Sequence, residues 1–389
     1  MIFKQHYEKL TSENISNHLI HIRHELHKHP ELSLEEINTT ALLKKECEKL
    51  NCAFLKELSP TGLIGCIKGT DATRPPIALR ADIDALPIQE ESNIDYKSII
   101  PGKMHACGHD MHTTWLLATL YLLNEHPAKQ DVIFIFQPAE EISAGAKIVL
   151  NTPYLNNVTE IYAGHVDLNY EVGQFVVHDG YISATSTIYT VTLTGKSSHI
   201  ARPHEGISPL PALAEIITLI NTITQSAPQQ DEALIVGIGN VHAGTANNIS
   251  PETATLEGSI RSLSQKNQDY IINTLKTEST NIAKKYQISV DIAFTPSSPA
   301  ILNHPTTNKR AKNCIRKQFS NNALTTLKQV NLASEDFGYY AKKIPATFLR
   351  IGSRHKNGDI IPAHNPKFLV DDDTIFAAGL AFFSICQND

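Results

Sequence analysis

Apolar residues recur along this chain with two periods, one typical of helices and one typical of buried strands. Ile15, Leu19, Ile22 and Leu26 repeat at three- and four-residue steps, which predicts a helix that ends at Pro30. Unbroken apolar runs then predict four strands and one helix: strands at 62–68, 76–82, 131–136 and 160–164, and a helix at 115–123. The alternation of strands with helices predicts an α/β fold.

The residues that precede the second predicted helix form the pattern of a capping box. Ser33 is followed three residues later by Glu36, and Ile37, Leu43 and Leu50 continue as its apolar positions. This pattern predicts a helix that opens at Ser33.

From about residue 182 the chain has the pattern of a smaller module. Strand, helix, strand, strand, helix and strand are predicted in turn at 187–195, 209–224, 233–240, 253–261, 268–286 and 288–294. This order matches a small α+β, ferredoxin-like sandwich. The α/β pattern then resumes with a helix at 305–319, a strand at 346–352 and a helix at 373–386. We therefore expect a main domain at 1–182 and 295–389, interrupted by a domain at 183–294.

Composition excludes several kinds of partner. The chain has 389 residues, 41% of them hydrophobic, and a formal net charge of -6 without any block of Lys or Arg. A nucleic acid or an anionic membrane therefore has no electrostatic footprint, and a small molecule is the expected partner. The N-terminus lacks the pattern of a secretory signal, and no apolar run is long enough to span a bilayer, so we expect a cytoplasmic protein.

Residues of metal-binding types gather in HACGHDMHT, residues 105–113, which contains Cys107, His109, Asp110 and His112. A thiolate together with imidazoles is typical of transition-metal sites. The chain's six cysteines lack the regular spacing of a disulfide framework, so Cys107 is expected to be a free thiol. The alternative is that Cys107 is a small buried hydrophobe and that the histidines are ordinary polar groups.

Further polar residues of ligand type follow the predicted strands. Asp82 and Asp84 end one strand, Glu140 and Glu141 follow the next, and His165 follows a third. Each residue alone could cap a helix or lie on a solvated face. In open α/β sheets, however, ligands bind beyond the carboxyl ends of the strands, where these side chains would converge with Cys107. The sequence therefore predicts one shared metal site.

Six motifs in the same order resemble the dinuclear amidohydrolases of metallopeptidase family twenty. They are RADIDALPI (80–88), HACGHDMHT (105–113), FQPAEE (136–141), GH (164–165), SEDF (334–337) and HNPKF (364–368). The resemblance is to the branch of hippurate hydrolases, N-acyl-amino-acid amidohydrolases, auxin-conjugate hydrolases and N-acetyldiaminopimelate deacetylases. It implies a mixed-sheet, zinc-exopeptidase-like catalytic domain with an inserted lid domain, through which the chain forms a homodimer.

The resemblance also implies a role for individual residues. Two divalent ions, Mn²⁺ or Zn²⁺ with Co²⁺ or Ni²⁺ as further candidates, would be bound by Cys107, His109, Glu141, His165 and His364. Glu140 would be the general base, and adjacent residues of an extended chain face opposite ways, so Glu140 and Glu141 would differ in role. Asp82 and Asp84 are better interpreted as carboxylates that orient ligand imidazoles.

In the lid, the resemblance implies that His199 stabilises the oxyanion, often across the dimer, while Asn248 and Arg261 hold polar groups of the substrate. Before the resemblance is considered, His199 is a solvated loop residue and Arg261 a member of a surface ion pair. Residues 247–251, NNISP, differ from the commoner asparagine-valine-isoleucine-proline pattern, but Asn248 keeps its place.

The sequence therefore indicates a metal-dependent amidohydrolase that splits N-acyl amino acids into an acid and a free amino acid. A dipeptidase, an aminopeptidase or an N-acetyldiaminopimelate deacetylase of the same fold is the nearest alternative. Two further alternatives belong to other classes: a metal-free cysteine hydrolase that uses Cys107 as its nucleophile, and a binding protein without catalysis.

Overall fold

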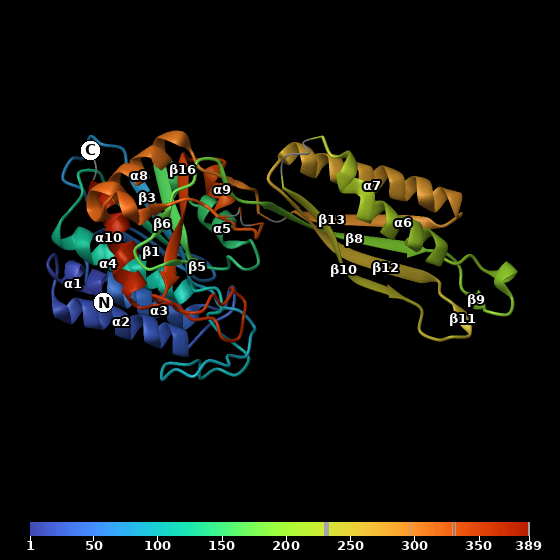
Figure 1. The fold of residues 1–389 in the computed structure, drawn as a ribbon, viewed down its shortest axis with the longest axis horizontal. Coiled ribbons are helices and arrows are strands. Elements are labelled where there is room, and N and C mark those ends of the chain that lie inside the picture. The colour runs from blue at the N-terminus through green and yellow to red at the C-terminus, as the bar shows by residue number, and fades with distance from the viewer. Residues whose placement is uncertain (229–232, 297, 329, 331, 388–389) are drawn as a thin grey trace. The chain divides into compact units, whose positions relative to one another are not determined.

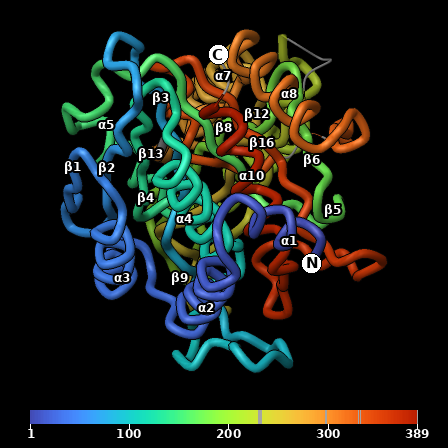
Figure 2. The backbone as a smooth tube through the Cα atoms, turned by 90° about the vertical axis from the view of Figure 1, so that its left-hand side faces the viewer, coloured from blue at the N-terminus to red at the C-terminus, as the bar shows by residue number. Residues whose placement is uncertain are grey.

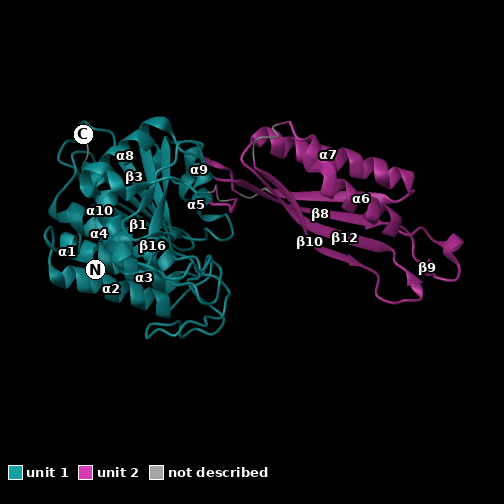
Figure 3. Cartoon of the chain, viewed as in Figure 1, with its two compact units in different colours: residues 1–182, 302–329, 336–389 teal, residues 183–301, 330–335 magenta. Residues whose placement is uncertain are grey.

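The chain folds into two compact units, one of which is inserted in the other (Figure 3). The computed structural model describes residues 1–228, 233–296, 298–328, 330 and 332–387. Unit 1 comprises Met1–Ile182, Leu302–Gln329 and Asp336–Asp389, and unit 2 comprises Ser183–Ile301 and Val330–Glu335. Unit 2 thus extends beyond residue 294, where the sequence pattern placed its end, and takes in a second short segment.

Unit 1 is built on a mixed sheet of eight strands in the order β1-β2-β4-β3-β5-β16-β6-β15 (Figure 1). The strands are β1 (Cys52–Glu57), β2 (Leu63–Ile67), β3 (Ile77–Asp82), β4 (Val132–Gln137), β5 (Glu160–Glu171), β6 (Phe175–Val176), β15 (Leu324–Thr325) and β16 (Ala346–Arg354). The central strands β4, β3, β5 and β16 run parallel to one another. The mixed α/β class predicted from the sequence is confirmed.

Helices surround this sheet, and α4 packs against both α2 and α10 (Figure 2). The helices of unit 1 are α1 (Ile2–Glu8), α2 (Glu13–Lys28), α3 (Ile37–Cys47), α4 (His109–Glu125), α5 (Gly145–Leu150), α8 (Pro305–Phe319), α9 (Gly338–Ala341) and α10 (Asp373–Gln387), with short 3₁₀ helices η1 (Pro153–Leu155) and η4 (Asn321–Ala323). In the described part of the chain, no helix combines the length and apolar character needed to cross a bilayer.

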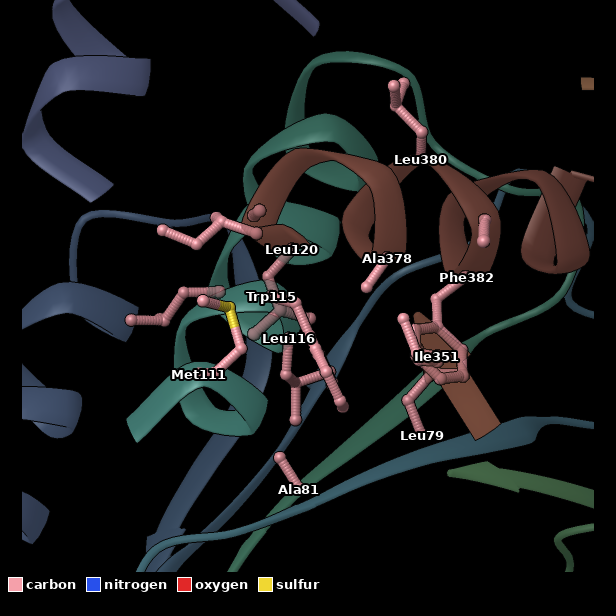
Figure 4. Packing of buried hydrophobic residues seen from close by; sticks show 14 of the residues in the cluster. Leu79, Ala81, Met111, Trp115, Leu116, Leu120, Ile351, Ala378, Leu380 and Phe382 are labelled. Atoms are coloured by element: carbon pink, nitrogen blue, oxygen red, sulfur yellow. The ribbon is translucent and has the colours of Figure 1, made fainter. Parts of the chain in front are cut away.

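The core of unit 1 is a layer of apolar side chains shared by the sheet, α4 and α10 (Figure 4). Leu79 of β3 and Ile351 of β16 are buried together with Trp115 and Leu116 of α4 and Phe382 of α10. Most residues of α4 are buried, including the polar ones of its first turn, so the helix lies largely inside the unit. Its first turn is thereby held in a fixed place beside the strand ends.

The order of the strands reverses between β3 and β5. From β3 the chain passes through α4 to β4 on one side, and it then returns to β5 on the other side. The ladder between β3 and β5 ends at the pair Leu79 and Tyr162, while β5 continues to Glu171 beside β16. A point where strand order reverses is the usual place for a ligand site in such sheets.

Unit 2 has a four-stranded antiparallel sheet in the order β10-β12-β8-β13, with α6 and α7 packed on it. Its elements are β8 (Thr185–Thr194), β9 (Ser198–His199), η2 (Pro203–Glu205), α6 (Leu210–Thr222), η3 (Ile223–Ser226), β10 (Leu234–Ala243), β11 (Ile249–Ser250), β12 (Thr253–Ser262), α7 (Gln265–Lys285) and β13 (Ser289–Pro296). Two short strands lie where the units join in sequence: β7 (Tyr181–Ser183) and β14 (Ile301–Leu302). The predicted order of strands and helices in this unit matches the structure.

Two local predictions were wrong. The helix predicted to open at Ser33 begins at Ile37, and the Ser33 hydroxyl instead donates to Asp84 Oδ2 at 2.7 Å. Glu36 is also engaged elsewhere, since its carboxylate accepts from the hydroxyl of Thr61. In the other case, the strand predicted to stop before His165 continues through it as β5.

Candidate active site

The first group of predicted ligands lies at the start of α4. Gly108 has a φ of +90°, and a Cβ there would lie 2.7 Å from Cγ2 of Val166, so the turn favours glycine for both reasons. The turn brings Cys107 Sγ to 3.3 Å from His165 Nε2. His165 Nδ1 lies 2.8 Å from the carbonyl oxygen of Val166 and therefore donates to it, so Nε2 carries no proton and its lone pair faces the thiol of Cys107.

His109, the first residue of α4, is oriented by Asp84. Its Nδ1 lies 2.9 Å from the carbonyl oxygen and 3.2 Å from Oδ1 of Asp84, and both atoms are acceptors. Nδ1 therefore carries the proton, and the lone pair of Nε2 is available to a metal. Asp84 Oδ2 also accepts from the backbone N–H of Glu141 at 3.0 Å. The carboxylate of Asp84 thus fixes two predicted ligands at once.

Glu141 and His364 complete the group. Glu141 Oε1 lies 3.9 Å from His109 Nε2 and 3.7 Å from His364 Nε2. His364 lies in a loop with a φ of +66°, and its backbone N–H donates to the carbonyl of Ala106 at 2.8 Å. Whereas Cys107 and His109 are buried, 53% of the His364 side chain is exposed.

The donor atoms form overlapping groups in which all atoms lie within 4.8 Å of one another: Cys107, His109 and His165; Cys107, Glu141 and His364; and His109, Glu140 and Glu141. His109 Nε2 and Glu141 Oε1 are buried and have no hydrogen-bond partner among the described residues. Buried polar atoms are rarely left unpaired, so these two fit the coordination of a cation. A thiolate, three imidazoles and a carboxylate suit a transition metal.

Electrostatics argue against a metal-free thiol nucleophile. Burial, reinforced by Glu141, raises the pKa of Cys107 well above its usual value. Burial and His112 lower the pKa of His165 well below its usual value, so the imidazole next to the thiol is a poor base. A nucleophilic cysteine needs the opposite shifts. Burial also raises the pKa of Glu141 to about 7, and a bound cation would favour its ionised form.

Glu140 lies beside these donor atoms and is largely buried. Glu140 and Glu141 follow β4 in a turn, so the sequence argument that treated them as part of an extended segment was wrong. Glu140 Oε1 accepts from the backbone N–H of Asp336 at 3.3 Å. The structure therefore brings together Glu140, Asp84 and all five predicted metal ligands within unit 1.

The three predicted lid residues lie in unit 2 and form no single group. His199 on β9 is paired in register with Ile249 of β11, and the backbone N–H of Ile200 donates to the carbonyl of Asn248 at 3.0 Å. His199 and Asn248 are exposed, and β9 and β11 lie at one end of the unit (Figure 1). Arg261, by contrast, lies on β12 opposite Ser186, near the residue where the chain enters the unit.

Further residues support the site, and the sequence did not reveal how they pair. Asp82 accepts from Arg80 Nη1 at 2.7 Å, and its other oxygen contacts His112 Nδ1. In the first turn of α4, Asp110 is bound by Arg23 and His27 of α2, at 3.2 and 2.9 Å. Arg80 is a polar residue within the apolar run PIALRAD, which is the signal that could have marked it as buried and paired, whereas Asp110 and His112 lie among the other ligand-type residues of HACGHDMHT.

Clustered metal-type donors with a further carboxylate, Glu140, beside them, placed where the strand order reverses, define the site of a metal-dependent hydrolase. A sequence model of the peptidase family M20/M25/M40 matches residues 78–384. The chain belongs to this family, whose hydrolases act on amide bonds.

Similar proteins cover nearly the whole chain. N-acetylcysteine deacetylase from Bacillus subtilis is 34% identical over 369 residues, 94% of each chain. Thermostable carboxypeptidase 1 from Saccharolobus solfataricus is 33% identical over 383 residues, 96% of each chain. Among solved structures, the YxeP protein of Bacillus subtilis, a dinuclear metal-binding peptidase from the M20 family, has a TM-score of 0.83 at 31% identity and covers 97% of this chain and 98% of its own.

Proposed function

We propose that this amidohydrolase cleaves the amide bond of N-acyl amino acids and releases a carboxylic acid and a free amino acid. The observation that carries the proposal is the five-ligand cluster with Glu140 beside it. Both named relatives support the substrate class, because a deacetylase of an N-acetyl amino acid and a carboxypeptidase each release an amino acid that bears a free carboxylate.

Within this proposal Cys107, His109, Glu141, His165 and His364 bind two divalent ions, with Zn²⁺ and Mn²⁺ as the first candidates and Co²⁺ and Ni²⁺ as further ones. Such a pair of ions supplies an acidified water and polarises the scissile carbonyl. Asp84 holds the proton of His109 on Nδ1, which keeps Nε2 directed at the donor cluster. Asp82 likewise accepts from Nδ1 of the neighbouring His112, whose Nε2 accepts from the backbone N–H of Val166 at 3.1 Å, so His112 supports β5 beside His165.

Glu140 is the general base of the proposed reaction. One of its oxygens accepts from the backbone N–H of Asp336, which orients the carboxylate beside the donor atoms, where a carboxylate can accept the proton of the attacking water. The carboxylic acid that results then donates this proton to the departing amine. Because Glu140 is largely buried, the proton stays close to the reacting atoms during the transfer.

The geometry of unit 2 supports a homodimeric active site. Arg261 lies opposite Ser186, and the sheet ends at Thr194, about 26 Å away at roughly 3.3 Å per residue. His199 lies beyond that end, so His199 and Arg261 of one lid cannot both contact one small substrate. We assign Arg261 to the carboxylate of the substrate and His199 with Asn248 to the oxyanion, with the two groups of one lid serving the active sites of different subunits.

The His199→Ala variant is expected to lower kcat by about 10²- to 10³-fold through loss of an oxyanion donor. The exposed position predicts little change in stability, within about 0.5 kcal/mol. Steady-state kinetics and thermal unfolding measure the two effects. His204→Ala, at another exposed histidine of unit 2, is the control. Unchanged kinetics of His199→Ala would return this residue to the role of a solvated loop histidine.

The proposed substrate class is tested by release of free amino acid from a substrate panel. The metal-loaded enzyme is given N-acetyl-L-cysteine, N-benzoylglycine, an indole-acetyl amino acid, N-acetyldiaminopimelate and several dipeptides. We expect kcat/KM for an N-acyl amino acid to exceed that for the dipeptides by at least about 10-fold. A dipeptide has a free α-amino group where the N-acyl substrate has an apolar acyl group, and burying that amino group without a partner is costly. Preference for dipeptides would contradict the proposal and favour a peptidase.

A cytoplasmic location belongs to the same proposal. It is supported by the state of the six cysteines, all of which are free thiols in the structure. Free thiols persist in reducing compartments.

A further inference from the structure

A completely buried ion network lies at the C-terminal ends of β3 and β4. Arg80 of β3 donates from Nη1 to Asp82 at 2.7 Å, from Nη2 to Asp336 at 2.8 Å, and from Nε to Gln137 Oε1 at 3.0 Å. The side chains of Arg80, Asp82 and Asp336 have no exposed surface. The guanidinium of Arg80 thus joins Asp82, which contacts His112, to Asp336, which lies far along the chain.

The carboxylate of Asp336 is held from several directions. Gln137 Nε2 donates to both of its oxygens, at 2.8 and 2.9 Å, and the backbone N–H of Ala146 donates to Oδ2 at 2.9 Å. Gln137 is itself oriented by the hydroxyl of Tyr340, which donates to Oε1 at 3.0 Å. Asp336 is also where the chain re-enters unit 1, directly after the Val330–Glu335 segment of unit 2.

This anchorage fixes a backbone group that contacts Glu140. The N–H of Asp336 donates to Glu140 Oε1 at 3.3 Å. The side chain of Asp336 is tied to β3 and β4, and β4 leads directly into the turn that carries Glu140. The donor and the carboxylate that it orients are therefore held by the same two strands.

Stability alone gives a poor reason for such a network. Arg80 is buried against two carboxylates, and buried ion groups of this kind are often no more stable than apolar side chains of similar volume. The network instead fixes the position of Asp336, because each of its members makes a directional hydrogen bond. We propose that Asp336, anchored by Arg80 and Gln137, is a positioning residue for the general base Glu140, an inference that rests on the proposed function.

The first test compares Asp336→Asn with the unaltered, metal-loaded enzyme on N-acetyl-L-cysteine or the best substrate of the panel. Asparagine keeps the volume but removes the charge that pairs with Arg80. We expect kcat to fall by roughly 10²-fold, as for a catalytic group displaced by about an ångström, with KM and the metal content unchanged. The control is Asp179→Asn, which removes an exposed ion pair of unit 1 with Lys312 and should leave kcat unchanged.

A double-variant cycle separates positioning from a general structural effect. In Glu140→Asp the carboxylate is withdrawn by one methylene and can no longer reach the N–H of Asp336, so adding Asp336→Asn should lower the residual kcat by less than about 3-fold. If Asp336→Asn lowers kcat by its full factor in both backgrounds, or lowers the metal content in parallel with kcat, the inference is overturned. If Glu140→Asp is as fast as the unaltered enzyme, the position of this carboxylate does not limit the rate and the inference is overturned, whereas the base assignment fails only if Glu140→Gln also keeps the unaltered rate.

Should Asp336→Asn not fold, Gln137→Met provides the same comparison. Methionine keeps the length of Gln137 and leaves Arg80 paired with both carboxylates, but it removes the two donations to Asp336. The expected pattern is again a lower kcat at constant metal content and KM, with no further loss in the Glu140→Asp background. An unchanged kcat in a folded Gln137→Met enzyme would count against the inference.

Discussion

The Glu140→Gln variant is expected to bind its full complement of metal and to lose about 10³-fold in kcat. Glutamine has the shape of glutamate and can still accept from the backbone N–H of Asp336, but it cannot take a proton from water. General-base catalysis contributes about 10²- to 10⁴-fold in enzymes, which sets the size of the loss. Elemental analysis and steady-state kinetics on the same preparation measure both quantities.

Glu57→Gln is the matched control, because Glu57 is an exposed carboxylate of unit 1 that pairs with Lys44. It should behave like the unaltered enzyme. Turnover at the unaltered rate in Glu140→Gln would remove Glu140 from the base role. A loss of both metal and turnover would instead place Glu140 among the ligands.

Removal of the metal is the second prediction with a large effect. Dialysis against a strong chelator should abolish activity, and adding back Zn²⁺ or Mn²⁺ should restore it. The stripped protein should also unfold at a lower temperature, because a ligand that binds only the folded state contributes about 4 kcal/mol at a thousandfold excess over its Kd. Differential scanning calorimetry, activity and metal analysis follow the cycle, and the ion that restores most activity identifies the metal.

Enzyme treated with chelator already saturated with metal is the control for this cycle. Activity that survives stripping would revive the alternative of a thiol nucleophile at Cys107. A parallel Cys107→Ser variant distinguishes the two chemistries. If the thiol is a ligand, this variant should regain part of its activity at high metal concentration, whereas a nucleophilic thiol would leave the variant inactive at every concentration.

The positions of most helices and strands could be predicted from apolar periodicity, because burial of apolar surface is a local property of the sequence. The helix predicted at 305–319 coincides with α8. The prediction that a helix opens at Ser33 was wrong, because the helix begins at Ile37. Its capping pattern is local, but the hydroxyl of Ser33 is engaged by Asp84, which lies far along the chain. A polar side chain that has a long-range partner is not available for the local one.

The types of the site residues were visible in the sequence, but their partners were not. Asp84, Glu140 and Glu141 could be identified because they are ligand-type residues that follow directly after apolar runs. The pairing of Arg80 with Asp336 joins residues 256 positions apart, and no periodicity reports a contact at that distance. The separation of Arg261 from His199 likewise needed the register of the sheet, because the sequence shows only that both lie in the inserted domain.

The unequal exposure of the predicted ligands has a kinetic consequence. An ion held by Cys107, His109 and His165 would be enclosed, whereas one held by Cys107, Glu141 and His364 would have solvent along one side, at the half-exposed imidazole. The two ions should therefore leave with different residence times, so metal release into a chelator should proceed in two phases. The faster phase would empty the position next to His364, and a mixed-metal enzyme could be prepared by refilling that position alone.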